Sequence, residues 1–229
     1  MLRGVTFEVR AGEVLAVIGP NGAGKTTLLE SIVGFQRIER GHVLYEGRPI
    51  DGLADRARVF SFMPDDADPP AELSVGAHIT HALHFGQPPP GLARQIEQRL
   101  GLVALRRARC GELSRGERRR LALYSALCTS RPVAVLDEPL GTFDPLQLVG
   151  IVELLRERAS AGLAVLLSIH QMSDAEKIAD RVLLLDGGCV LAIGTMGELR
   201  QAAGLDNGSL EQLFLALLRQ ARTGARGVP

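Results

Sequence analysis

The sequence has few cysteines, no excess of charge of either sign and no long apolar run, and each of these absences excludes a class of protein. Its cysteines, Cys110, Cys128 and Cys189, lie far apart without a CxxC pair, so neither a disulfide framework nor a zinc site is indicated. Lysine plus arginine and aspartate plus glutamate both total 26, which argues against a broad polyanion-binding surface, and no nucleic-acid partner is expected. Apolar runs such as 14–18 are short, whereas a transmembrane helix needs about 20 residues.

The N-terminus also lacks the apolar core of a signal peptide. The chain has 229 residues, of which 46% are hydrophobic and 23% charged, as expected for one globular domain. We therefore expect a cytoplasmic protein, in which any membrane role must come from a partner.

Four apolar runs are typical of strands buried on both faces, because they do not alternate with polar residues. They are Val14–Ile18, Val133–Leu136, Val165–Ile169 and Val182–Leu185. Helical patterns lie between them, at Thr26–Val33 and at Leu146–Arg158, where a stripe of Val149, Val152 and Leu155 is expected. This alternation predicts the α/β fold class, with a parallel sheet covered by helices.

Two stretches read as antiparallel hairpins. Residues 42–50 turn at Glu46-Gly47, and residues 182–193 turn at Asp186-Gly187-Gly188. The segment from about 65 to 131 has no convincing strand. We therefore predict one domain over 1–229, with a mixed sheet core (1–64 and 132–229), a small antiparallel part and an inserted helical subdomain.

A glycine-rich segment follows the first strand and matches G-x-x-x-x-G-K-[ST] at every fixed position. Its glycines allow backbone N–H groups to converge on phosphate oxygens, and the following helix N-terminus adds positive potential. We expect Lys25 to reach the β- and γ-phosphates and Thr26 to ligate Mg²⁺. The predicted nucleotide-binding residues of this P-loop NTPase are Gly19, Pro20, Asn21, Gly22, Ala23, Gly24, Lys25, Thr26 and Thr27.

Polar groups follow two further strands. Asp137 and Glu138 end the run 133–136, and His170 ends the run 165–169. Ligands of open α/β sheets bind at the carboxyl ends of strands, so these side chains are expected beside the phosphate loop. Asp137 suits Mg²⁺, Glu138 is the candidate general base, and His170 is either structural or a donor to the γ-phosphate. With Lys25, Glu138 and His170 form the predicted catalytic set.

One further motif, Leu113-Ser114-Arg115-Gly116-Glu117, stands before the Asp137 strand. It resembles the LSGGQ signature of the ABC ATPase family, and the resemblance covers nearly the whole chain. It implies that two cassettes, identical or closely related, pack head to tail, so that each signature closes on the ATP of its partner. Leu140–Pro145 resembles the D-loop of the family.

The resemblance further implies an ATP- and Mg²⁺-dependent subunit that powers a separate transmembrane permease. The segments 194–199 and 209–214 look like the tail of cassettes that serve ABC-2 type exporters. The alternatives are a soluble ABC ATPase outside transport and a nucleotide-sensing cassette with little turnover. The cargo, the direction of transport and homo- or heterodimerisation are not predicted.

The sequence departs from the family at three places. Asp65 stands where the Q-loop glutamine is expected, after a strand at Val59–Pro64, and we predict it as a further Mg²⁺ ligand. Arg115 and Glu117 replace Gly and Gln of the signature. The N-terminal strand and the adenine-stacking aromatic of the family would lie upstream of Leu2–Val9. Either Met1 is an internal start, which is the hypothesis we favour, or the cassette binds adenine without that aromatic.

Two weaker patterns remain. His78, His81 and His84 share a broad helix face near Asp65, which is compatible with a metal site but more typical of a polar face. An arginine run is interpreted as a solvated helix that also serves the phosphates of the partner; it comprises Arg106, Arg107, Arg109, Arg115 and Arg118–Arg120.

Overall fold

The computed structural model describes residues 2–224, which are built around a six-stranded sheet. The strand order is β4-β5-β6-β1-β7-β8, and every neighbouring pair is parallel except β7 and β8. The strands are β1 (Val14–Ile18), β4 (Phe60–Met63), β5 (Val133–Leu136), β6 (Ala164–Ile169), β7 (Arg181–Asp186) and β8 (Cys189–Gly194). The predicted mixed α/β fold is confirmed.

The central strand β1 shows why these apolar runs become an internal sheet. Its five residues are all buried. Val14, Ala16 and Ile18 belong to one hydrophobic cluster, and the alternate residues Leu15 and Val17 belong to a second cluster on the other face. A strand with two apolar faces is stable only between two layers, and helices provide those layers.

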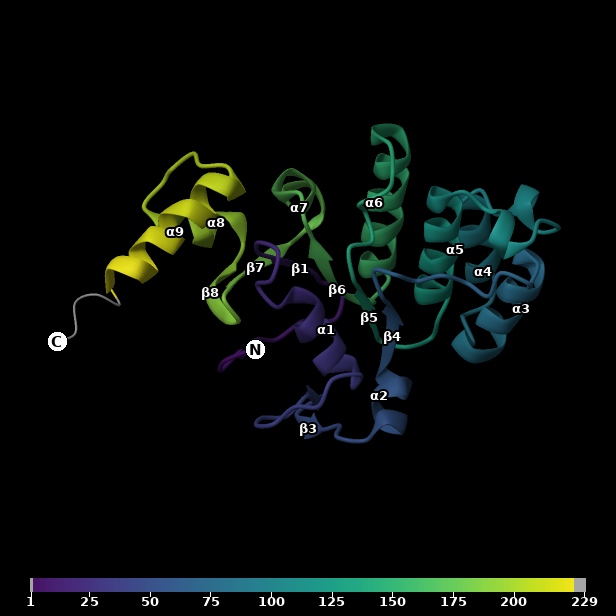
Figure 1. Cartoon of the computed structure of the whole chain (residues 1–229), viewed down its shortest axis with the longest axis horizontal. Coiled ribbons are helices and arrows are strands. Elements are labelled where there is room, and N and C mark those ends of the chain that lie inside the picture. The colour runs from purple at the N-terminus through teal and green to yellow at the C-terminus, as the bar shows by residue number, and fades with distance from the viewer. Residues whose placement is uncertain (1, 225–229) are drawn as a thin grey trace.

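Helices cover both faces of the sheet and extend beyond its two ends (Figure 1). Helices α3 to α5 lie at one end and α8 and α9 at the other, which gives the molecule an elongated outline in this view. The helices are α1 (Lys25–Val33), α2 (Leu53–Val59), α3 (Val75–Gly86), α4 (Leu92–Arg99), α5 (Arg115–Leu127), α6 (Pro145–Ser160), α7 (Met172–Ile178), α8 (Met196–Ala203) and α9 (Leu210–Gly224).

Both predicted hairpins are present. Strands β2 (Leu44–Tyr45) and β3 (Arg48–Pro49) are joined by Glu46 and Gly47, whose φ angles are 50° and 75°. Two consecutive positive φ values are what a tight hairpin turn requires. The other hairpin, β7–β8, turns at Gly187 and Gly188.

The segment between β4 and β5 contains α3, α4, α5 and two 3₁₀ turns, Val103–Leu105 and Cys110–Glu112. Helix α5 ties this helical part to the sheet, because Leu121, Tyr124 and Leu127 are buried in the same cluster as Val14 of β1. Within residues 2–224, no helix is both long enough and apolar enough to cross a membrane.

Two local predictions were wrong in detail. Val149 does not belong to the buried stripe of α6: it is 57% exposed, whereas Ile151, Leu154 and Leu155 face the core. A repeated spacing of three residues, as at 149, 152 and 155, drifts round a helix, whereas alternating spacings of three and four stay on one face. The strand expected from Val59 begins at Phe60, because Val59 closes helix α2.

Candidate functional site

The carboxyl ends of four parallel strands bring the candidate residues to one edge of the sheet. The phosphate loop follows β1, Asp137 and Glu138 follow β5, and His170 follows β6. Asp65 lies just beyond β4, which pairs with β5. Strand order rather than sequence separation therefore sets which of these groups meet.

The phosphate loop has the backbone that its glycines allow. Gly22 and Gly24 have φ angles of 79° and 102°, and α1 begins immediately afterwards at Lys25. A Cβ at Gly19 would lie 2.1 Å from the carbonyl oxygen of Leu185, closer than any real contact. The loop therefore turns at Gly19, where only glycine fits. The backbone N–H groups that follow the loop belong to the N-terminus of α1, where they can bind an anion.

Lys25 and the exposed Thr26 occupy the first turn of α1. The Lys25 ammonium is buried, donates to the carbonyl oxygen of Gly19 at 2.9 Å and lies 3.9 Å from Oε1 of Glu138. A cation held by a carbonyl and a nearby carboxylate is poised to exchange those partners for phosphate oxygens.

A hydroxyl inside β6 joins the two acids that follow β5. Ser168 Oγ donates to Asp137 Oδ1 at 2.5 Å and accepts from the Glu138 N–H at 2.8 Å. Asp137 is 1% exposed, and its other oxygen, Oδ2, has no hydrogen-bond partner within residues 2–224. A buried carboxylate oxygen without a partner is costly unless a cation binds it.

Glu138 stands at the centre of the polar cluster. Its Oε1 lies 3.3 Å from Nε2 of His170 as well as 3.9 Å from Nζ of Lys25. Its φ of 50° is a strained left-handed conformation for a non-glycine residue, of a kind that clusters at functional sites. Burial raises the pKa of Glu138 to about 7, although Lys25 opposes the shift. Such a carboxyl group is suited to take a proton near neutral pH.

The residues present fit a magnesium ion. Asp137 Oδ2 and the hydroxyl of Thr26 are the hard oxygen ligands that Mg²⁺ prefers. Asp65, the third predicted ligand, has its carboxylate on Arg119, with Oδ1 3.1 Å from Nη2. Its Mg²⁺ role stays a prediction, and the observed pairing gives it another partner.

The signature segment forms the start of α5. Ser114 is the N-cap and accepts from the Glu117 N–H at 3.3 Å, while its own hydroxyl and N–H donate to the Glu117 carboxylate. Leu113 is buried, whereas Arg115 is exposed. A Cβ at Gly116 would meet nothing within 4 Å, so packing inside this chain does not require glycine there.

The segment predicted as a D-loop also ends in a cap. Asp144 Oδ1 accepts from the N–H groups of Leu146 and Gln147 and so begins α6. The apolar side chain of Leu146 is 88% exposed beside this cap.

Sequence reasoning missed two residues of the cluster, Ser168 and Arg119. A lone hydroxyl in an otherwise apolar strand signals a buried partner, and this signal was available for Ser168. Arg119 was assigned to a solvated arginine run, which is wrong for this residue because it is 6% exposed.

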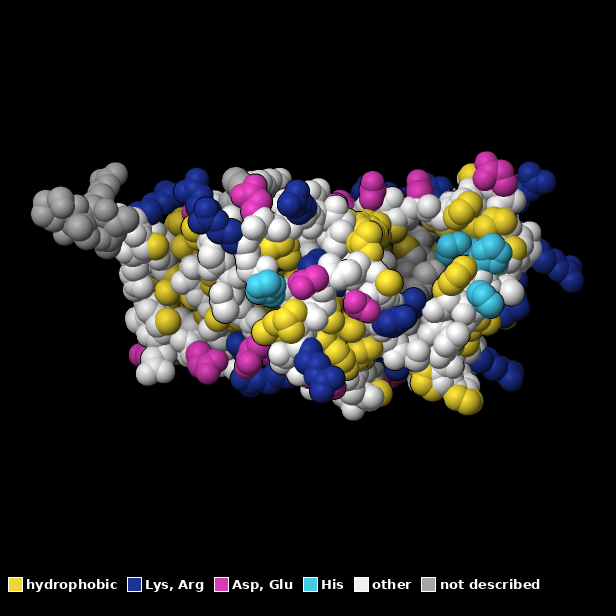
Figure 2. Space-filling view, turned by 90° about the horizontal axis from the view of Figure 1, so that it is seen from below, with side chains coloured by type: hydrophobic (Ala, Val, Ile, Leu, Met, Phe, Trp, Pro, Cys, Tyr) yellow, Lys and Arg dark blue, Asp and Glu magenta, His cyan; other side chains and the backbone are white. Residues whose placement is uncertain are grey.

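The three histidines of α3 do not form a metal centre. Figure 2 shows histidine side chains gathered toward the end of the molecule where α3 lies. His78 Nε2 is 2.9 Å from Ser125 Oγ, and residues 2–224 hold no cluster of three His, Cys, Asp or Glu side chains suited to a metal ion.

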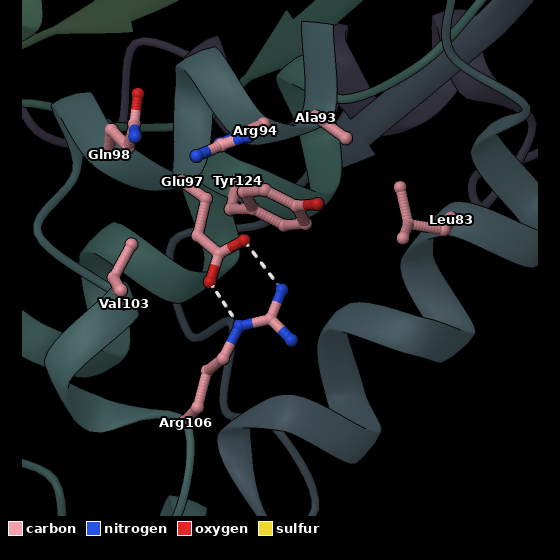
Figure 3. Close-up of a pocket in the computed structure, with 8 residues that line it drawn as sticks. All are labelled: Leu83, Ala93, Arg94, Glu97, Gln98, Val103, Arg106 and Tyr124. Atoms are coloured by element: carbon pink, nitrogen blue, oxygen red, sulfur yellow. Dashed lines mark hydrogen bonds and ion pairs between the residues drawn. The ribbon is translucent and has the colours of Figure 1, made fainter. Parts of the chain in front are cut away.

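A hollow of about 350 Å³ lies in the helical part, lined by Leu83, Tyr124 and neighbours (Figure 3). Its polar feature is a two-pronged ion pair in which Arg106 donates to both oxygens of the buried Glu97, at 2.5 and 2.7 Å. None of its lining residues belongs to the phosphate loop or to the Glu138 cluster.

Comparisons with known proteins show the family to which the chain belongs. The family described as ABC transporter matches residues 2–141, more than half of the chain. The lipopolysaccharide export system ATP-binding protein LptB of Acidithiobacillus ferridurans is 33% identical over 94% of this chain and 90% of its own length. The hemin import ATP-binding protein HmuV of Streptomyces coelicolor is 35% identical, over 86% of this chain and 74% of its own.

A solved structure of an ATP-binding subunit of an ABC transporter has the same fold. It superimposes with a TM-score of 0.86 and 29% identity, covering 95% of this chain and 92% of that one. The chain therefore belongs to the ABC transporter family, as an ATP-binding domain. ABC ATP-binding subunits are ATPases coupled to transport. The relatives serve both import and export, so they do not confirm the predicted ABC-2 exporter type.

Proposed function

We propose that this chain hydrolyses MgATP at the Lys25–Glu138–His170 cluster and, paired head to tail with a second cassette, drives a separate transmembrane permease. The observation that carries the proposal is the convergence of the Lys25 and His170 side chains on the carboxylate of Glu138. Oε1 of Glu138 is 3.9 Å from Lys25 Nζ and 3.3 Å from His170 Nε2. Each group follows a different strand, and this convergence supports a common reaction site.

The chain's residues divide the work of hydrolysis. Lys25 and the loop N–H groups hold the phosphates, and Asp137 with Thr26 holds Mg²⁺, which neutralises phosphate charge when bound. Ionised Glu138 accepts the proton of the water that attacks the γ-phosphorus, while the bond from phosphorus to the ADP oxygen breaks. His170 orients that water or donates to the γ-phosphate.

The signature supports a partner cassette. Ser114 and Gly116 present a capped helix N-terminus whose glycine has open space above it. Such a terminus binds anions, and we propose that it closes on the ATP of the second copy. The ABC-2 exporter type, the inner membrane face as the working place and Mg²⁺ as the metal ion belong to this proposal.

The matched pair Gly116→Asp and Gly197→Asp tests the head-to-tail arrangement. Both glycines are the second residue of a helix inside a capping box, in α5 and α8, and neither introduced Cβ meets a close contact. An acid at Gly116 repels the phosphates of a partner, so we expect ATP binding to persist while turnover falls by about a hundredfold. Gly197→Asp retains turnover. Normal turnover in Gly116→Asp would refute the composite site.

The proposed association with a permease is tested by purifying the tagged chain from detergent-solubilised membranes of its source organism. We expect it to bring down a protein with about six apolar segments of about 20 residues each. Full recovery of an active ATPase without any membrane protein would favour the soluble alternative. ATP binding without turnover, with the permease present, would favour the nucleotide-sensing alternative.

A further inference from the structure

Arg119 is a buried arginine in the second turn of α5, 6% exposed. Its guanidinium reaches two strand ends. Nη1 donates to the Asp65 carbonyl oxygen at 2.5 Å, and Nη2 lies 3.1 Å from Asp65 Oδ1. Nη2 also donates to the carbonyl oxygen of Asp137 at 3.0 Å and to that of Glu138. An arginine is buried only where such acceptors compensate its lost hydration.

Two of these acceptors belong to the turn that carries the candidate general base. The Glu138 backbone is held on one side by Ser168, which accepts its N–H, and on the other by Arg119, which binds its carbonyl. This clamp encloses a residue in a strained conformation, with φ of 50°. Strained residues persist only where the surroundings over-determine them. Arg119 is therefore placed to set the direction of the Glu138 side chain.

Asp65 supplies the negative charge opposite Arg119. Burial lowers the pKa of the Arg119 guanidinium, and Asp65 is the foremost group that opposes this shift. A second pair, Asp68 with Arg118 at 3.1 Å, joins the same loop to α5. The carboxylates of both pairs are largely exposed, 63% for Asp65 and 77% for Asp68. Arg119, however, is buried and also binds the Asp65 carbonyl oxygen, whereas the Arg118 side chain is 32% exposed. The loop after β4 is thus tied to α5 chiefly through Asp65 and Arg119.

We propose that Arg119 is a positioning residue that holds the Asp137–Glu138 turn for hydrolysis, and that Asp65 is its counter-ion rather than a ligand of Mg²⁺. The proposal rests on the proposed function of Glu138. It also explains the acid at position 65. A neutral glutamine there would remove the carboxylate that pairs directly with the guanidinium and leave only the weaker influence of the Asp137 and Glu138 charges. Displacement of the 65–68 loop then acts on the catalytic turn through Arg119.

The first test measures hydrogen–deuterium exchange in the nucleotide-free protein. Arg119→Gln is compared with Arg120→Gln, a control on the same helix whose Nη1 binds the Leu100 carbonyl instead. We expect Arg119→Gln to speed exchange by about tenfold in both the 65–68 loop and the 138–141 turn, because both lose a restraint. Arg120→Gln leaves both segments unchanged. Equal exchange in the two variants overturns the link.

The second test separates kcat from KM. Arg119→Gln and the charge-retaining Arg119→Lys are expected to lower kcat by about tenfold or more while KM for ATP stays within about threefold, because Arg119 contacts the turn and not the loop that binds phosphates. If Arg119→Gln does not fold, Arg119→Lys decides. Wild-type kcat in a folded Arg119 variant overturns the proposal.

The third test separates a counter-ion from a metal ligand. Asp65→Asn is expected to lower kcat by about threefold in the wild-type background and by less than about twofold beside Arg119→Gln, since coupled residues are not additive. The half-saturating Mg²⁺ concentration stays unchanged. A rise of about tenfold in that concentration would identify Asp65 as a ligand and refute its counter-ion role.

These readouts distinguish the two proposals. If the wild-type chain does not hydrolyse ATP, the proposed function fails, and the exchange measurement alone decides whether Arg119 links the loop to the turn. If the wild type hydrolyses ATP and the Arg119 variants match it, only the positioning role fails.

Discussion

Replacing Glu138 with glutamine should stabilise the nucleotide-free protein, and more so as pH rises. The carboxyl group has a pKa of about 7 in the folded chain against an ordinary value of 4.5, chiefly because it is buried. A raised pKa means that the folded state favours the protonated form. The group imposes no penalty below about pH 4.5, and the penalty grows as pH rises through 4.5 to 7 and is complete above 7.

The size of the effect follows from these two pKa values. One pKa unit corresponds to about 1.4 kcal/mol, so the Glu138 carboxyl group lowers the free energy of unfolding by about 1 kcal/mol near pH 5.5, where the folded chain keeps it protonated, and by about 3 kcal/mol near pH 8.5, where it is ionised. Glutamine carries no charge at either pH. The stability difference between Glu138→Gln and wild type should therefore increase by about 2 kcal/mol between these conditions.

Urea unfolding of both proteins without nucleotide, at about pH 5.5 and pH 8.5, measures this difference directly. Glu39→Gln, at an exposed carboxylate before the first hairpin, is the control and should show no comparable trend. A stability difference that stays constant or shrinks as pH rises would refute the claim that burial of Glu138 raises its pKa.

Three further variants test the site around Glu138. Gly19→Ala places a Cβ 2.1 Å from the Leu185 carbonyl oxygen, so thermal unfolding should occur at lower temperature and binding of a fluorescent ATP analogue should weaken; unchanged binding would contradict the tight loop. Ser168→Ala deprives Asp137 Oδ1 and the Glu138 N–H of their shared partner and should cost about 1–3 kcal/mol in urea unfolding, whereas no loss would mean the hydroxyl is dispensable. His170→Ala should lower phosphate release by about a hundredfold with ATP affinity retained; wild-type turnover would remove His170 from the mechanism.

Motifs whose residues are adjacent in sequence were predictable. The phosphate loop follows directly from glycine spacing after a buried run, and the strand bounds of β1 and β5 match the predicted runs. The meeting of Glu138 with His170 was also predictable, because both end parallel strands. The turn at Glu46-Gly47 followed from residue type alone.

Contacts that depend on helix rotation were not predictable. Three consecutive arginines, Arg118 to Arg120, differ in burial because each step turns the side chain by about 100° round α5, and only Arg119 points under the Asp137–Glu138 turn. The same reason applies to α6, where Val149 lies outside the buried face. The partner of Asp65 could not be read from sequence, since its arginine lies 54 residues away on another element.

The role of Glu138 in hydrolysis is tested most directly by measuring phosphate release from MgATP by the wild-type chain and by Glu138→Gln, with ATP binding recorded on the same samples. We predict that both proteins bind ATP and that turnover in the variant falls by about a hundredfold or more, because the group that accepts the proton of water is gone. Turnover in Glu138→Gln equal to wild type would contradict the central role of Glu138.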